Sequence, residues 1–322
     1  MPAVTARAHP NIAFIKYWGN ADDRLKLPVN SSLSMNLAEI YTDTTVEWGI
    51  GNSDVLVLNG EEQSGTPLQR VVRHLDLVRA RLNLTEKATV VSTNNFPMGA
   101  GIASSASSFA ALTLAATRAA NAHLEEKELT TLARIGSGSA SRSIPTGFVE
   151  WHKGSDHESS YAESIFPPDH WNLIDVIAVI NVGHKKTGSE AGHPTAKTSD
   201  LQLARISGAA ERLAVCKQAI TDRNFPSFAE VVEMDSNLMH AVMLTSHPPL
   251  MYWLPASIAI MQSVREWRGE GLNVCFTLDA GPNVHCLCTQ AAQSELLRRL
   301  QQLEGIVELR VTTVGQGTVI LS

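Results

Sequence analysis

The hydrophobic and polar positions along the chain follow two periods, one typical of strands and the other typical of helices. Alternating or short apolar runs predict strands over residues 4–9, 55–58, 89–93, 148–152, 175–182, 273–278, 284–288, 308–314 and 318–321. We expect the last two strands to form a closing pair. Apolar residues at every third or fourth position predict helices over residues 106–122, 125–135, 201–220, 225–244, 249–268 and 291–303. These elements do not alternate strictly as in a doubly wound sheet, which favours the α+β class.

The length of 322 residues indicates two domains or one large two-lobed unit. No low-complexity linker or internal repeat marks the division. We place the boundary near residue 180, which gives an N-terminal lobe over residues 1–180 and a C-terminal α+β lobe over residues 181–322. A cleft between two lobes is the usual location of a ligand site, so we expect the site there.

The composition excludes several classes of protein. Basic residues number 26 and acidic residues 32, so the formal net charge is −6 and no overall basic field is available for nucleic acid or an anionic membrane. No apolar run approaches the ~18 residues that span a bilayer. The N-terminal segment contains Arg7, His9 and Asn11 where a signal peptide needs an apolar stretch. We therefore expect a cytoplasmic protein.

Neither the cysteines nor the histidines form a pattern typical of a metal site. None of the 4 cysteines belongs to a C-x-x-C pair, and we interpret them as buried thiols in a reducing compartment. The 11 histidines show no metal-ligand spacing. His184 and His193 flank a polar loop, and we interpret both as surface residues.

A glycine-rich stretch precedes the helix predicted over residues 106–122. Gly99 and Gly101 allow the backbone to approach a ligand closely. Ser104 and Ser105 stand at the helix start, where free N–H groups and the helix dipole attract an anion such as phosphate. The stretch lacks the G-K-[ST] ending of a Walker A motif. A glycine turn before a serine-capped helix explains it equally well.

Three further places carry groups that suit an anionic substrate. Hydroxyl groups surround Arg142 within residues 136–143, and a guanidinium can hold a carboxylate bidentately. Asp279 ends an apolar strand, where a carboxylate can orient or deprotonate a hydroxyl. Lys16 lies beside two aromatic residues. Taken singly, each place also has a structural explanation: a flexible loop with a solvated arginine, an Asx turn, and an amphipathic strand with a snorkelling lysine.

Together, the motifs resemble those of one family. They are, in chain order, NIAFIKYWG (11–19), LPVNSSLS (27–34), NNFP (94–97) through ASSA (103–106), GSGSASRS (136–143), EMDSN (233–237) and DAGPN (279–283). From about residue 4 to residue 320, the chain closely resembles the mevalonate diphosphate decarboxylases of the GHMP kinase superfamily. Each motif is weak alone, but their combination and order are highly specific.

The resemblance implies a two-lobed GHMP-kinase-like fold and a lyase of isoprenoid biosynthesis that uses ATP and Mg²⁺. The family phosphorylates the tertiary 3-hydroxyl of a 5-phosphorylated mevalonate. Loss of that phosphate with CO₂ then leaves an isopentenyl alkene. The resemblance also implies a homodimer whose partner is this small molecule, with neither nucleic acid nor membrane.

The family's site residues are carried over motif by motif. Asp279 would orient or deprotonate the 3-hydroxyl, Arg142 would hold the substrate carboxylate and contact Asp279, and Lys16 would act beside them. The residues expected to bind substrate are Tyr17, Trp18, Arg70, Ser137, Ser139, Arg142 and Ser189. The residues expected to hold the ATP phosphates are Gly99, Gly101, Ala103, Ser104 and Ser105, with Ser105 also a ligand of Mg²⁺.

Two departures from the family concern the phosphate end of the substrate. The family usually has Lys after Tyr-Trp-Gly, where this chain has Asn20. It usually has two serines and then Thr or Arg before Gly-Met, where this chain gains the carboxylate of Glu190. Both regions face the diphosphate in the family, and like charges at close range repel. We therefore predict a preference for mevalonate 5-phosphate, with isopentenyl phosphate as the product.

Three alternatives stay open. The substrate could be mevalonate 5-diphosphate, with isopentenyl diphosphate as the product. The chain could be a kinase of the same superfamily that phosphorylates without decarboxylating, or a non-catalytic nucleotide-binding sensor. The set of Lys16, Ser105, Arg142 and Asp279 favours an enzyme over a sensor. The cations expected to bind the two polyanions are Lys16, Arg70, Arg142, Lys185 and Lys186.

Overall fold

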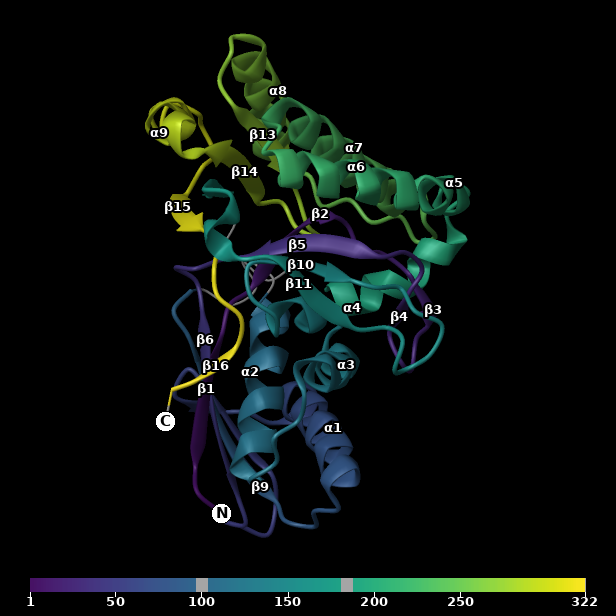
Figure 1. The fold of residues 1–322 in the computed structure, drawn as a ribbon, viewed down its shortest axis with the longest axis vertical. Coiled ribbons are helices and arrows are strands. Elements are labelled where there is room, and N and C mark those ends of the chain that lie inside the picture. Colours follow the sequence, from purple (N-terminus) through teal and green to yellow (C-terminus); the bar gives the residue numbers. More distant parts are fainter. Residues whose placement is uncertain (97–103, 181–187, 322) are drawn as a thin grey trace.

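The computed structural model describes residues 1–96, 104–180 and 188–321, and these ranges have a mixed α and β architecture (Figure 1). Their strands form three sheets and a short hairpin of β3 (Asn20–Asp22) with β4 (Leu27–Pro28). The predicted α+β class is confirmed. Within the same ranges a membrane-spanning helix is absent, because no helix combines the required length with the required hydropathy.

The first sheet has the strand order β16-β1-β6-β9-β7-β8. Its strands are β1 (Val4–Ala8), β6 (Thr42–Trp48), β7 (Val55–Leu58), β8 (Glu61–Glu62), β9 (Ala88–Asn94) and β16 (Val319–Ile320). Helices α1 (Gly65–Leu82), α2 (Ser104–Ala119) and α3 (Glu126–Gly136) pack together beside it (Figure 1). Buried residues alternate along β6, and the last of them, Trp48, donates from its indole Nε1 to the Ala116 carbonyl of α2 at 2.9 Å. One face of the sheet therefore forms a core with these helices.

Two four-stranded sheets make up the rest of the β structure. The second sheet, β11-β10-β5-β2, contains β2 (Asn11–Ile15), β5 (Ser32–Asn36), β10 (Phe148–Trp151) and β11 (Ala162–Phe166). The third sheet, β13-β14-β12-β15, contains β12 (Leu173–Val179), β13 (Val274–Thr277), β14 (Val284–Thr289) and β15 (Glu308–Thr313). All residues of β12 are buried, because its alternate side chains join two different cores. This double burial explains its continuous apolar sequence.

The remaining helices follow residue 188. They are α4 (Ser189–Gly192), α5 (Gln202–Ser207), α6 (Ala209–Asp222), α7 (Phe225–Thr245), α8 (Pro255–Gly269) and α9 (Gln293–Leu300). Short 3₁₀ helices lie at Gly138–Ser143, Pro168–His170, His193–Thr198 and Gln290–Ala292. Helix α7 packs against β2 and β13, and the rings of Phe14 and Phe228 meet edge to face with centroids 4.9 Å apart.

Several predicted elements differ from the structure. The helix predicted over residues 201–220 is divided at Gly208 into α5 and α6, and the helix predicted over residues 249–268 begins only at Pro255. The predicted closing pair is wrong, since β15 pairs with β12 in the third sheet and β16 pairs with β1 in the first. Local sequence patterns do not reveal which distant strand lies beside a given one. The interpretation of the cysteines as buried thiols is confirmed, because all four are free and buried.

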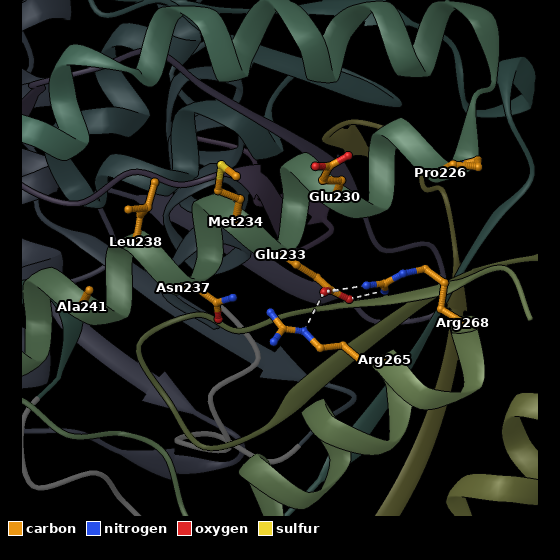
Figure 2. A pocket seen from close by; sticks show the side chains of 9 residues that line it. All are labelled: Pro226, Glu230, Glu233, Met234, Asn237, Leu238, Ala241, Arg265 and Arg268. Carbon is orange, nitrogen blue, oxygen red and sulfur yellow. Dashed lines mark hydrogen bonds and ion pairs between the residues drawn. The ribbon is translucent and has the colours of Figure 1, made fainter. Parts of the chain in front are cut away.

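The EMDSN segment (233–237) of helix α7 contacts both β13 and the residue that follows β2. Glu233 accepts hydrogen bonds from Arg265 and Arg268 of α8, beside a cavity of 710 Å³ (Figure 2), and from the Phe276 N–H of β13. Asp235 is fully buried and accepts from the Lys16 N–H at 2.7 Å and from Arg212 Nε at 2.7 Å. This helix therefore holds the ends of β2 and β13 at a fixed separation.

We expect the replacement Asp235→Ala to lower the free energy of unfolding by about 3–5 kcal/mol, because it leaves the buried Arg212 without its counter-ion. Urea denaturation with linear extrapolation measures the change. The matched control is Glu230→Ala on the same helix, where the side chain is exposed and the expected change is within about 0.5 kcal/mol. Equal midpoints for both variants would contradict this prediction.

Candidate active site

A cavity of 610 Å³ collects the predicted site residues that the structure describes. Its lining includes Lys16, Tyr17, Trp18, Arg70, Ser104, Ser105, Ser137, Ser139, Arg142, Ser189 and Asp279. Gly99, Gly101 and Ala103, together with His184, Lys185 and Lys186, lie outside the described residues. The larger cavity beside α7 and α8 is lined by none of the predicted site residues in the described ranges. The 610 Å³ cavity is therefore the candidate active site.

Lys16 and Asp279 form an ion pair at the wall of this cavity. Lys16 directly follows β2, and Asp279 lies two residues after β13. The Lys16 Nζ and Asp279 Oδ1 atoms are 2.7 Å apart. The lysine side chain is 1% exposed and the aspartate side chain 28% exposed, so the carboxylate faces the cavity and the amine is sealed behind it. Ser236 supports the pair from α7, because its hydroxyl accepts the Leu278 N–H.

The electrostatics of this pair favour an ionised Asp279. Burial raises the pKa of the Asp279 carboxyl, but the charges of Lys16 and His285, the hydrogen bond from Lys16 and the charge of Arg142 outweigh it and hold the pKa below its ordinary value. Burial lowers the pKa of Lys16, and Asp279 opposes that shift. A carboxylate with a lowered pKa is a weak base. The arrangement is suited to orienting a hydroxyl and accepting its proton late in a reaction.

Arg142 is a buried cation without a carboxylate partner among the described residues. It donates from Nη1 to Ser32 Oγ at 2.7 Å, from Nε to Ser34 Oγ at 3.1 Å and from Nη2 to Asn11 Oδ1 at 3.1 Å. Burial lowers its pKa to about 10, so it stays charged at neutral pH. The direct contact with Asp279 expected from the resemblance is not formed, because Asp279 pairs with Lys16 instead. A buried cation that has no carboxylate within ion-pair distance is suited to binding an anionic ligand.

Serine hydroxyls line the cavity next to Arg142. Ser105, in the first turn of α2, lies with its Oγ 3.2 Å from Ser137 Oγ, which is 3.5 Å from Ser139 Oγ. Between these two serines, a Cβ on Gly138 would come within 2.5 Å of the Tyr17 ring. Glycine is therefore required here for Tyr17 to pack against the serine segment.

A second group of charged residues lines the same cavity. Glu190 of α4 pairs with two cations, Lys26 Nζ at 3.3 Å and Arg70 Nη2 at 3.0 Å. Nearby, the Tyr17 hydroxyl donates to Asn20 Oδ1, and Asn20 Nδ2 donates to Asp23 Oδ1 at 2.9 Å. The sequence predicted Arg70 and singled out Asn20 and Glu190. It missed Lys26 and Asp23, which belong to a short hairpin without a recognised motif.

His193 is the third residue that the sequence missed. It was expected at the surface, but it is half-buried, lines the cavity and packs its ring against Tyr17 and Trp18. That interpretation is therefore wrong. The imidazole lies beside Tyr17 because the end of α4 packs closely against the Trp18 indole. A Cβ on Gly192 would come within 2.6 Å of the indole, so this glycine allows the close approach.

Comparisons with known proteins first define the class. The mevalonate diphosphate decarboxylase from Staphylococcus aureus superposes with a TM-score of 0.94 at 39% identity, over 99% of this chain and 98% of that one. A second solved structure, of MDDEF in complex with MVAPP, AMPPCP and magnesium, gives a TM-score of 0.92 at 38% identity, over 99% of both chains. The fold is therefore the predicted two-lobed fold of the GHMP kinase superfamily.

Sequence comparisons then define the family. The chain is 38% identical over 325 residues to the diphosphomevalonate decarboxylase of Candida albicans, covering 95% of this chain and 90% of the relative. The model of the diphosphomevalonate decarboxylase-like N-terminal domain matches residues 8–162, and that of the mevalonate 5-diphosphate decarboxylase C-terminal domain matches residues 175–316. The chain belongs to the diphosphomevalonate decarboxylase family and is an ATP-dependent decarboxylase.

The ion pair predicts a shift in the pH dependence of turnover. In a Lys16→Met variant, Asp279 loses its nearest opposing charge, so its pKa rises and the acid limb of kcat moves to higher pH, by about 1–3 pH units. The measurement is CO₂ release against pH, with ¹³C NMR titration of the carboxyl group if turnover is slow. Lys26→Met is the matched control, because Lys26 pairs with Glu190. A limb that stays in place, or moves equally in both variants, would refute the assignment.

Proposed function

We propose that this decarboxylase uses ATP and Mg²⁺ to convert mevalonate 5-phosphate into isopentenyl phosphate, CO₂, ADP and phosphate. The observation that carries the proposal is the position of Glu190, whose carboxylate occupies the two cations of the second charged group, Lys26 and Arg70. The coarser activity, decarboxylation of a 5-phosphorylated mevalonate, follows from the family.

The two charged groups of the cavity suggest how the substrate lies. Arg142, which has no carboxylate within ion-pair distance, suits the carboxylate at C1, and Asp279 suits the 3-hydroxyl. The 5-phosphate then extends towards the group that contains Lys26, Arg70 and Glu190. Ser137 and Ser139 offer hydroxyls to substrate oxygens between the two groups.

The reaction proceeds in two steps in this proposal. The 3-hydroxyl oxygen bonds to the γ-phosphorus of ATP, ADP leaves, and Asp279 accepts the hydroxyl proton. The bond between C1 and C2 then breaks, and its electron pair forms the double bond between C2 and C3. Phosphate departs from C3 with the electrons of the C–O bond. Lys16 keeps Asp279 ionised and oriented, and Arg142 holds the carboxylate until CO₂ leaves.

The start of helix α2 is suited to binding the nucleotide phosphates and the metal ion that accompanies them. Ser104 and Ser105 begin a helix of 16 residues, where free N–H groups attract phosphate oxygens. Mg²⁺ is usually held by substrate phosphates, waters and few protein oxygens. The described residues contain no cluster of acidic or histidine ligands for a metal, so the Ser105 hydroxyl next to the nucleotide phosphates fits an ion that arrives with ATP. Such an ion would neutralise charge on the transferred phosphoryl group.

The charge balance of the second group favours one phosphate over two. Lys26 and Arg70 share the carboxylate of Glu190, and Asn20 replaces the lysine usual in the family. Two unit charges 4 Å apart repel by about 4 kcal/mol at an effective dielectric constant near 20. Glu190 is 50% exposed, so solvent screening reduces this repulsion. We therefore expect a preference for the monophosphate of about tenfold or more, which corresponds to about 1.4 kcal/mol or more.

The relatives favour the alternative substrate, mevalonate 5-diphosphate. The relative from Candida albicans is a diphosphomevalonate decarboxylase, and the solved complex of MDDEF contains MVAPP. An experiment that compares the two substrates therefore decides between them. The homodimer, the lobe boundary near residue 180 and a cytoplasmic location stay predictions.

The substrate experiment compares kcat/KM for the two mevalonate phosphates with ATP and Mg²⁺ at saturation. We expect the wild type to prefer the 5-phosphate by about tenfold or more, and the double variant Asn20→Lys, Glu190→Arg to shift this ratio towards the diphosphate by at least about tenfold. The matched control is Glu163→Arg, a charge reversal at a carboxylate with the same 50% exposure that does not line the cavity. A wild-type preference for the diphosphate, or an unchanged ratio in the double variant, would refute the proposal.

A second experiment tests the roles of Asp279 and Arg142. We expect Asp279→Asn and Arg142→Ala each to reduce ATP-dependent CO₂ release by at least about 10²-fold, because one loses the proton acceptor and the other the partner of the carboxylate. Asp222→Asn, an exposed residue at the end of α6, is the control. Turnover close to wild type in either site variant defeats its role. Phosphorylated mevalonate without CO₂ from the wild type would identify the kinase alternative.

A further inference from the structure

The imidazole of His193 is held in a fixed orientation at the wall of the active-site cavity. Its ring stacks on Tyr17 with centroids 4.1 Å apart and an interplanar angle of 29°. It also lies against Trp18, with centroids 4.6 Å apart and an angle of 35°. His193 begins the 3₁₀ helix that follows α4, three residues after Glu190. The ring therefore belongs to the part of the cavity that contains the second charged group.

The hydrogen bonding of this ring determines its tautomer. Nδ1 accepts the Gly19 N–H at 3.1 Å, so this nitrogen carries no proton. Burial, together with the charges of Lys26, Arg205 and Arg142, lowers the pKa of His193 to about 3. The ring is neutral in the neutral pH range, and its one proton resides on Nε2.

The Nε2–H group is left open to the cavity. Within the described ranges no side chain or carbonyl bonds to Nε2, and this atom is not among the buried polar atoms without a partner. The residue itself is half-buried and lines the cavity. A neutral donor in a fixed direction is suited to one acceptor oxygen of a ligand.

We propose that His193 is a substrate-binding residue whose Nε2–H group donates a hydrogen bond to an oxygen of the substrate's 5-phosphate. The inference rests on the proposed function for the position of that phosphate. Lys26 and Arg70 already share the carboxylate of Glu190, so a neutral donor adds direction without adding charge. His193 thus supplies part of the recognition of a single phosphate.

Two variants separate the donor from the stacking. His193→Phe keeps an aromatic ring beside Tyr17 and Trp18 but removes both nitrogens, whereas His193→Gln gives up stacking and retains an N–H donor. Calorimetric titration measures the Kd of mevalonate 5-phosphate and of unphosphorylated mevalonate. We expect His193→Phe to weaken binding of the phosphate ester by about 10–100-fold and His193→Gln to weaken it less. Neither variant should change binding of mevalonate by more than about twofold.

The relative affinities of the two variants for the phosphate ester test the inference. The proposal is wrong if the His193→Gln variant binds the phosphate ester more weakly than the His193→Phe variant does. It is also wrong if His193→Phe weakens the binding of mevalonate as much as the binding of the phosphate ester. In either case the ring serves only to pack the cavity wall. A ¹⁵N NMR measurement on the wild type needs no variant: we expect the Nε2–H signal of His193 to move when mevalonate 5-phosphate binds and to stay in place with mevalonate. An unmoved signal overturns the proposal. A wild-type preference for the diphosphate would refute the proposed function alone, because the same comparison can be made with either ester.

Discussion

The ion pair between Lys16 and Asp279 is the interaction on which the rest of the site depends. An amine that is 1% exposed loses nearly all of its hydration, and such a charge is tolerated only with a close counter-ion and a fixed geometry. Helix α7 provides that geometry, because Asp235 binds the backbone of Lys16 and Ser236 binds the backbone just before Asp279. The helix thereby holds two chain segments 263 residues apart within one hydrogen bond.

The cations that line the cavity have two kinds of partner. Arg142 is surrounded by hydroxyl and amide oxygens, so its charge is solvated by the protein but not neutralised. Lys26 and Arg70, in contrast, share the carboxylate of Glu190. A ligand that is anionic at both ends meets a cation without an ion-pair partner at one end, and at the other end two cations that already share one carboxylate.

Much of the site could be predicted from sequence, and what could not be predicted has a common cause. Asp279, Arg142, Lys16 and the serines were identified because each lies in a short motif whose chemistry is local, and one cavity contains them all. His193 was assigned to the surface, because nothing in its neighbouring residues indicates that it stacks on Tyr17. The predicted closing pair of the last two strands failed for a similar reason, since β16 pairs with β1 across almost the whole chain.

The sequence by itself determined the α+β class, the family and half of the residues that line the cavity, because hydrophobic periodicity and the order of motifs are properties of the chain read from one end to the other. Only the tertiary structure decided which charges neutralise one another. Lys26, Arg70 and Glu190 are far apart in sequence, and their pairing depends on how a hairpin, helix α1 and helix α4 meet at one side of the cavity. An ion pair requires two charges within a few ångströms of each other, and this distance in space cannot be obtained from the separation of the residues along the chain.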